Sequence, residues 1–252
     1  MVLIMEKGFT RLKNYLKELN EGILRANKPL RFGLGFLRVS ELIQQLYCEL
    51  KLHYTYSQGV EPEYKRRYII RKMLDIYLNA EKKAKATNGN FYVKLPLIAP
   101  IREIPVIGSP DAIFFERYNP KIILRIRKSR SLKIYPEDEA RGLIYGALLE
   151  KLGFKINDLK YVIIIAKDLE GLLELIPSIS KSIVKREGIS IKEKHNVRIA
   201  VRVYNSKEAE ELINYLLSYW EMLREPRPNP SKSKCYLCKY SRICPYSSLE
   251  SR

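Results

Sequence analysis

The stretch that most constrains the fold covers residues 107–145, where strand, turn and helix signals follow one another. Residues 111–117 form an apolar, β-rich run, and Asn119-Pro120 is a typical turn pair. The residues after this pair alternate in part between apolar and basic side chains. Pro136 suits the first position of a helix, and the three acidic residues that follow it favour the positive end of the helix dipole. The stretch therefore predicts a β-hairpin, a loop and a helix.

An acidic residue opens one strand of a hairpin, a charged pair lies on the next strand, and a helix follows. This order resembles the catalytic core of the PD-(D/E)XK nucleases. In that family an Asp and a Glu hold the metal ion, and a Lys two residues after the Glu stabilises charge at the phosphate. The RecB-like branch adds Gln-x-x-x-Tyr on the helix. By this resemblance Asp111 and Tyr145 take the Asp and Tyr positions. Arg125 and Arg127 stand at the Glu-x-Lys positions, and Arg141 stands in place of the Gln.

Helical apolar spacing predicts three helices before this core, over residues 5–26, 41–56 and 63–85. The first is expected to end near Pro29, and the second contains Cys48. In RecB-like nucleases a helix at the place of the third often carries a metal-binding His, and Arg71 stands at the corresponding position here.

Strands are predicted over residues 91–99, 104–107, 161–166 and 197–204, with a helix over residues 169–186. Asn205 is a candidate cap for a helix that reaches Arg224, and three prolines then form a stiff tether. We expect an α/β fold with a PD-(D/E)XK core, in which a mixed central sheet is flanked by helices. The expected regions are N-terminal helices (1–88), the core (89–224), and a proline tether with a cysteine-rich segment (225–252).

The chain carries 46 Lys and Arg against 28 Asp and Glu, for a formal net charge of +18. Such an excess indicates a polyanionic partner, most often a nucleic acid, because phosphate contacts release counterions. Residues 117–133 contain seven basic residues and no acidic one. The predicted DNA-binding residues are Arg125, Arg127, Lys128, Arg130, Lys133 and Arg141. The basic helix around Lys82 fits a solvated face or a DNA contact equally well.

No apolar run reaches the ~18 residues that span a bilayer, and residues 1–10 lack the apolar core of a signal peptide. We therefore expect a cytoplasmic protein without a membrane partner, in which disulfides are disfavoured. The composition, with only three Gln, is typical of a thermophile.

Three cysteines near the C-terminus follow the pattern Cys235-x2-Cys238-x5-Cys244. Closely spaced thiols in a reducing compartment indicate a metal site. Zinc would need a fourth ligand from His53, His195 or Cys48. A [4Fe–4S] cluster takes four thiolates, and the only further cysteine is Cys48.

One early cysteine followed by this C-terminal pattern resembles the iron–sulfur RecB-like nucleases, and best the CRISPR-associated exonucleases that act with the spacer-integration complex. The residues Val39-Ser40-Glu41-Leu42 are also similar to that family, and the resemblance covers residues 39–246. It implies a structural [4Fe–4S] cluster on Cys48, Cys235, Cys238 and Cys244. It also implies several partners. They are DNA, as single strands or duplex ends, the integrase complex, a related active nuclease and further copies of this chain.

The charges at the matched positions predict a nuclease pocket that has become a phosphate-binding pocket. Arg125 at the Glu position opposes Mg²⁺ or Mn²⁺ and can pair with Asp111 instead. Asp111 alternatively ends a turn, and Tyr145 alternatively belongs to the core. A rival function is an active exonuclease that uses displaced carboxylates, Glu116 or Glu137. A third is a general nucleic-acid-binding scaffold without a CRISPR role.

Overall fold

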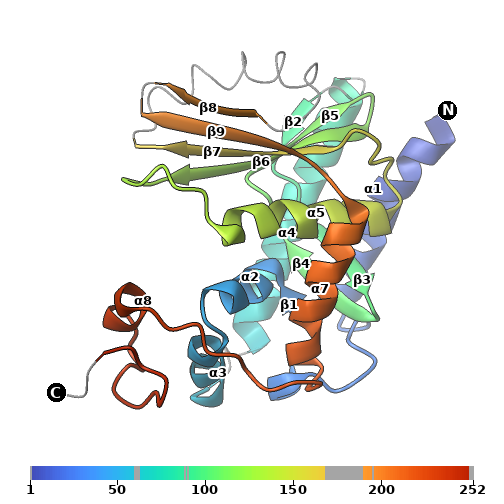
Figure 1. The fold of residues 1–252 in the computed structure, drawn as a ribbon. Coiled ribbons are helices and arrows are strands. Elements are labelled where there is room, and N and C mark those ends of the chain that lie inside the picture. The colour runs from blue at the N-terminus through green and yellow to red at the C-terminus, as the bar shows by residue number, and fades with distance from the viewer. Residues whose placement is uncertain are drawn as a thin grey trace.

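The structure, a computed structural model, describes residues 2–59, 63–87, 89, 91–167, 190–194 and 196–249. It has a mixed α/β architecture with two mixed sheets and flanking helices (Figure 1). The predicted helix over residues 169–186 lies outside the described residues, and so does His195.

The larger sheet has six strands in the order β2-β5-β6-β7-β9-β8. Its strands are β2 (Phe91–Val93), β5 (Ala112–Glu116), β6 (Asn119–Lys128), β7 (Lys160–Ala166), β8 (Ser190–Lys194) and β9 (Val197–Val203). The central pair, β6 and β7, is parallel, and the other neighbours are antiparallel. Strand β7 is buried along its whole length, as its continuous apolar sequence predicts.

The smaller sheet has three strands in the order β1-β4-β3, namely β1 (Leu37–Arg38), β4 (Ile104–Gly108) and β3 (Leu97–Ile101). The single strand predicted over residues 91–99 is therefore wrong, because these residues form β2 and β3 in different sheets. Pro96 lies in the connection between them. Proline has no backbone N–H to donate to a neighbouring strand, which disfavours one continuous strand here.

The predicted hairpin is confirmed, since β5 and β6 pair in antiparallel fashion. Its turn differs from the prediction: Arg117 and Tyr118 form it, with φ of 47° and 64°. Asn119 and Pro120 already belong to β6. Two turn residues with positive φ match the right-handed twist of the flanking strands, which accounts for the shift.

The described helices include seven α-helices and one 3-10 turn: α1 (Val2–Asn20), η1 (Arg31–Gly33), α2 (Val39–Tyr47), α3 (Glu49–Ser57), α4 (Glu63–Ala86), α5 (Pro136–Leu152), α7 (Ser206–Trp220) and α8 (Lys232–Tyr236). Helix α5 packs on β3, β6 and β7 and against α7, between the two sheets (Figure 1). Buried side chains from α1 through α7 join one apolar cluster on this side of the larger sheet. A second cluster, made of side chains of β6, β7 and β9, lies on the other face.

Helix α5 begins and ends as its sequence predicts, with Pro136 in its first turn and Gly153 at φ 85° after its end. Two glycines let it approach its neighbours closely. A Cβ at Gly142 would lie 2.4 Å from Cγ of Tyr161 on β7, and one at Gly146 would lie 2.3 Å from the Tyr204 ring. The missing Cβ atoms at these positions let α5 lie close to β7 and to the residue that follows β9.

Two predicted helices end earlier than expected. Helix α1 stops at Asn20, well before Pro29, and Gly22 follows in a left-handed conformation at φ 76°. The helix predicted over residues 41–56 is broken at Cys48, which is extended at φ −171° and ψ 114°. Cys48 therefore lies at a corner between α2 and α3.

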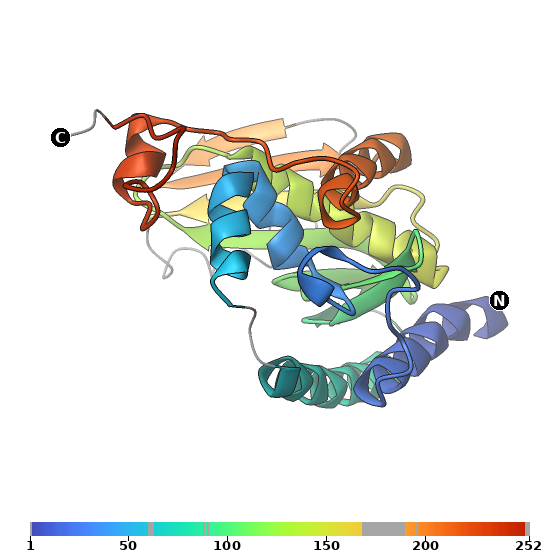
Figure 2. The same ribbon diagram turned by 90° about the horizontal axis from the view of Figure 1, so that it is seen from below.

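The chain after α7 crosses the molecule and returns to α2 and α3 (Figure 2). Asn205 caps α7 as predicted, since its side chain accepts hydrogen bonds from the amides of Lys207 and Glu208. This helix ends at Trp220, a few residues before the prediction. Within the described residues, no helix combines the length and apolar character needed to cross a membrane.

Candidate functional site

Asp111 precedes β5 at the open end of the hairpin, opposite the middle of β6. Its Oδ2 accepts a hydrogen bond from the amide of Ile126 at 2.7 Å. The same oxygen accepts one from Nη1 of Arg125 at 3.1 Å. The predicted pairing of Asp111 with Arg125 is thus present in the structure.

Asp138 is a second carboxylate at this site, and sequence analysis missed it. It lies in the first turn of α5 and is 4% exposed. Its Oδ1 is 3.5 Å from Nε of Arg125, and its Oδ2 is 3.2 Å from Nη2 of Arg127. Arg125 therefore lies between Asp111 and Asp138 and pairs with both.

The displaced carboxylates considered from the sequence occupy other positions. Glu116 is at the far end of β5 from Asp111 and faces Asn119 across the turn. Glu137 does not line the pocket that Asp111 and Asp138 share. The signal that could have found Asp138 is its place three residues after Tyr135, whose amide donates to its Oδ2 at 3.2 Å.

The pocket around these groups has a volume of about 320 Å³, open solvent included. Arg141 and Tyr145 line it from α5, together with Ser109 and Tyr161. Tyr145 is 5% exposed, and its hydroxyl donates to the carbonyl of Ser109 at 2.9 Å. Burial raises the pKa of Tyr145 to about 12, although the nearby Arg141 guanidinium opposes the shift. Tyr145 is thus a buried, neutral hydrogen-bond donor.

Charges in and beside the pocket do not cancel. Three guanidinium groups, from Arg125, Arg127 and Arg141, face two carboxylates, from Asp111 and Asp138, which leaves an excess of one positive charge. Nε of Arg125 and Nε of Arg127 are buried without a hydrogen-bond partner among the described residues. The arrangement favours an anion over a divalent cation.

A basic rim lies beside the pocket, at the end of β6 and on the loop that leads to α5. Its members, Lys128, Arg130 and Lys133, are exposed, and their contact with DNA stays a prediction. Nη2 of Arg127 donates to the carbonyl of Lys133 at 2.5 Å, which fixes the loop to β6. The exposed ring of Tyr135 lies 4.9 Å from the Arg127 guanidinium. An exposed aromatic ring among cations can stack on a nucleobase.

Arg71 lies on α4, but its side chain is outside the described part of the chain. Its assignment to the position of the metal-binding His in RecB-like nucleases therefore stays a prediction. Lys82 and Lys83, on the same helix, are exposed.

All four cysteines line one pocket of about 420 Å³, open solvent included. Cys48 enters it from the corner between α2 and α3, Cys235 from α8, and Cys238 and Cys244 from the turns that follow. All four are free thiols. Residues nearly two hundred positions apart in the sequence thus line the same pocket.

The donor set of this pocket fits a metal centre, although its side chains are not arranged around one. No three His, Cys, Asp or Glu side chains in the described ranges converge closely enough to hold a single ion. The four thiols nevertheless line one pocket, and rotation about Cα–Cβ moves a thiol while the backbone decides which thiols can meet. Thiolate is the form that binds metals, and the hydroxyl and amide of Ser248 near the Cys235 sulfur lower the pKa of that thiol.

His53 lies away from the cysteines and is absent from the residues that line their pocket. Its ring packs 5.5 Å from Phe32, and its Nδ1 is 3.4 Å from the Tyr219 hydroxyl. Burial lowers the pKa of His53, so the ring is neutral near pH 7. Of the two candidates for a fourth ligand that the structure describes, Cys48 lines the pocket of the other three cysteines and His53 does not.

Comparison with known proteins adds little. No protein-family model matches the sequence, and no curated protein matches it. A solved structure described as "Crystal structure of SSO0001" is similar over 94% of this chain and 96% of that chain, with a TM-score of 0.42 and 18% sequence identity. Similarity at this level carries no argument about family or function.

Proposed function

We propose that this protein binds DNA, holds a [4Fe–4S] cluster on its four cysteines and does not cleave the phosphodiester bond. The PD-(D/E)XK core that the sequence resembles serves here as a DNA-binding scaffold in CRISPR adaptation. The expected partners are the integrase complex, a related active nuclease and further copies of this chain.

The position of Arg125 between Asp111 and Asp138 carries the proposal. Nucleases of this class use carboxylates to hold a divalent ion, which polarises the phosphate and generates a hydroxide near neutral pH. Here both carboxylates of the pocket pair with guanidinium groups. A fixed positive charge thus occupies the place that Mg²⁺ or Mn²⁺ needs.

The basic rim supports binding to the phosphate backbone. Guanidinium and ammonium groups around the pocket attract phosphate without reading sequence. Tyr135 adds a stacking surface for an unpaired base, which favours single-stranded DNA or frayed duplex ends.

The cysteine pocket supports a metal centre with Cys48, Cys235, Cys238 and Cys244 as ligands. By the resemblance, a [4Fe–4S] cluster bound there supplies a structural cross-link between the early helices and the C-terminal segment. Zinc is the alternative, since four thiolates also suit a tetrahedral site.

A binding assay tests the DNA-binding part of the proposal. Labelled single-stranded and duplex DNA are titrated in EDTA, and we expect affinity without a divalent ion. The double variant Arg130→Glu with Lys133→Glu should bind more weakly, with a salt slope reduced by about 0.7 for each lost contact to a single strand. Lys82→Glu with Lys83→Glu makes the same charge change on α4 and serves as the control. Equal losses in both double variants would show that the rim is not the binding site.

Asp138 also favours a second candidate, an active exonuclease. Asp111 and Asp138 form a carboxylate pair that could hold a metal ion if Arg125 moved away. Metal-dependent cleavage that is lost in both Asp111→Ala and Asp138→Asn would establish this alternative.

A further inference from the structure

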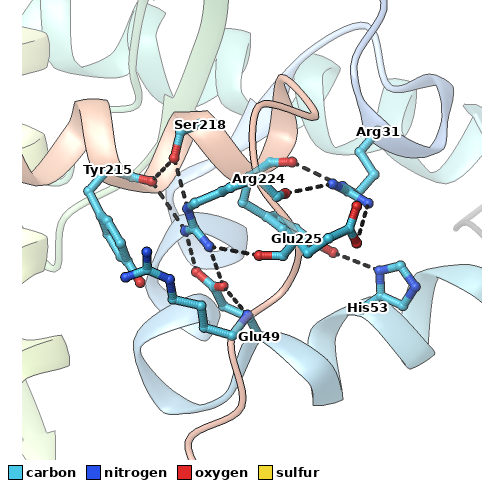
Figure 3. A network of polar contacts seen from close by, with 9 residues as sticks. Arg31, Glu49, His53, Tyr215, Ser218, Arg224 and Glu225 are labelled. Carbon is cyan, nitrogen blue, oxygen red and sulfur yellow. Dashed lines mark hydrogen bonds and ion pairs between the residues drawn. The ribbon is translucent and has the colours of Figure 1, made fainter.

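The base of the proline tether is held by one buried carboxylate, Glu49, the residue after Cys48 (Figure 3). Glu49 lies in the first turn of α3 and is 2% exposed. Its Oε1 accepts a hydrogen bond from Nη2 of Arg224 at 2.5 Å, and its Oε2 accepts one from Nη1 at 2.6 Å. The amide of Arg227 donates to the same Oε2 at 2.7 Å. Three hydrogen bonds thus connect the tether to Glu49, the neighbour of the candidate metal ligand Cys48.

Arg224 is itself fixed by the end of α7. Its Nε donates to the Ser218 hydroxyl at 2.8 Å, and its guanidinium lies 4.3 Å from the Tyr215 ring. Its main-chain carbonyl accepts a hydrogen bond from Nη2 of Arg31 at 2.8 Å (Figure 3). The planar guanidinium of Arg224 is hydrogen-bonded to Ser218 and to Glu49, so it has little freedom to turn away from Glu49.

The segment after Arg224 contacts the corner at Cys48 through hydrogen bonds that involve no sulfur atom. The Asn229 side-chain amide donates to the carbonyl of Leu46 at 3.2 Å, and Nζ of Lys234 donates to the carbonyl of Tyr47 at 2.9 Å. These carbonyls are free to accept because the helix breaks at Cys48. Pro226, Pro228 and Pro230 stiffen the stretch between the carboxylate and Cys235.

We propose that Glu49 and Arg224 form a latch that docks the C-terminal cysteines beside Cys48 before any metal is bound. The inference rests on the cysteine site of the proposed function and assigns a positioning role to two residues that are not ligands. Because the latch is metal-independent, the full-length protein keeps this segment docked after its metal has been removed.

The test measures the alkylation rate of Cys235 in metal-free, reduced, full-length protein, by peptide mass spectrometry. Cys235 is 9% exposed in the docked segment, so its alkylation requires opening. Glu49→Gln keeps the shape of the side chain and removes its charge. We expect at least about tenfold faster alkylation, which corresponds to about 1.4 kcal/mol of lost docking free energy.

Glu225→Gln is the matched control. Glu225 is a neighbouring carboxylate that is 88% exposed and pairs only loosely with Arg31, at 4.0 Å. Its neutralisation should leave the rate within about twofold of wild type, as expected for an exposed pair.

Two results would overturn the latch. One is a wild-type metal-free protein in which Cys235 reacts as fast as in denaturant, because the metal alone then docks the segment. The other is a folded Glu49→Gln variant with the wild-type rate. If near-UV circular dichroism shows that Glu49→Gln is unfolded, Arg224→Lys takes its place. This variant keeps the positive charge and loses the two-pronged guanidinium. An unchanged alkylation rate there also overturns the proposal. None of these readouts involves DNA or a bound cluster, so they remain decisive if the proposed function fails.

Discussion

Replacing Arg125 by Glu and Arg127 by Lys should give the pocket a divalent-ion site. An ion held by Asp111 and Asp138 would stand roughly 4 Å from the Arg125 guanidinium, where unit charges interact by about 1 kcal/mol in water and about 4 kcal/mol near a protein surface. A divalent ion doubles these values, so the repulsion is about 2 to 8 kcal/mol. The value near 2 kcal/mol applies here, because the side chains of Arg125 and Asp111 are 27% and 36% exposed and water screens their charges.

Even about 2 kcal/mol corresponds to about 30-fold weaker binding. We therefore expect the double variant to bind Mn²⁺ at least about 30-fold more tightly than wild type, measured by titration calorimetry. Arg130→Glu changes the net charge by the same amount at an exposed position outside the pocket and is the control. If the double variant binds Mn²⁺ no better than Arg130→Glu, the electrostatic account of the pocket is wrong.

Three further predictions concern the core, the buried tyrosine and the cysteine pocket. Gly142→Ala should destabilise the protein by about 1–3 kcal/mol, because the new methyl meets a ring on β7, whereas Gly35→Ala, with its nearest neighbour at 3.7 Å, should leave the thermal midpoint unchanged. Burial raises the pKa of Tyr145 to about 12, above its value of ~10 in the unfolded chain, so its neutral form stabilises the fold fully below pH ~10. The free energy of unfolding, measured by denaturant titration, should therefore fall between pH ~10 and 12. Tyr145→Phe should lack this fall. Anaerobically purified protein should contain iron and acid-labile sulfide that Cys48→Ser loses and His53→Ala keeps, and zinc in place of iron would contradict the cluster.

Local signals explain the part of the fold that could be predicted. The hairpin is marked by two β-rich runs close together in the sequence, although its turn lies two residues earlier than the pair Asn119-Pro120. Helix α5 carries its own boundaries, with Pro136 at its start and Gly153 after its end. Asn205 likewise marks the start of α7. Such signals act over a few residues and need no tertiary partner.

The break at Cys48 could not be predicted, because helical apolar spacing continues through it. The carbonyls that the break exposes bind Asn229 and Lys234, which are far away in the sequence. Tertiary contacts therefore decide a feature that local periodicity opposes. The same holds for Glu49, whose partner Arg224 lies 175 residues away.

Asp138 shows why the candidate site was found only in part. The sequence identifies three acids in the first turn of α5 and assigns them to the helix dipole. Which of them faces the hairpin depends on how α5 is rotated against β6, and that rotation follows from tertiary packing such as the close contact between Gly142 and Tyr161. The arginines of β6 were predicted, and their second carboxylate partner was not.

A cleavage assay tests the central claim most directly. Anaerobically purified protein with its metal content confirmed is incubated with end-labelled single-stranded and duplex DNA in Mg²⁺ or Mn²⁺, beside an Asp111→Ala control. We predict that the DNA is bound and stays intact with both proteins. Cleavage by the wild type that disappears in Asp111→Ala would show that the pocket is a working nuclease site and would contradict the account.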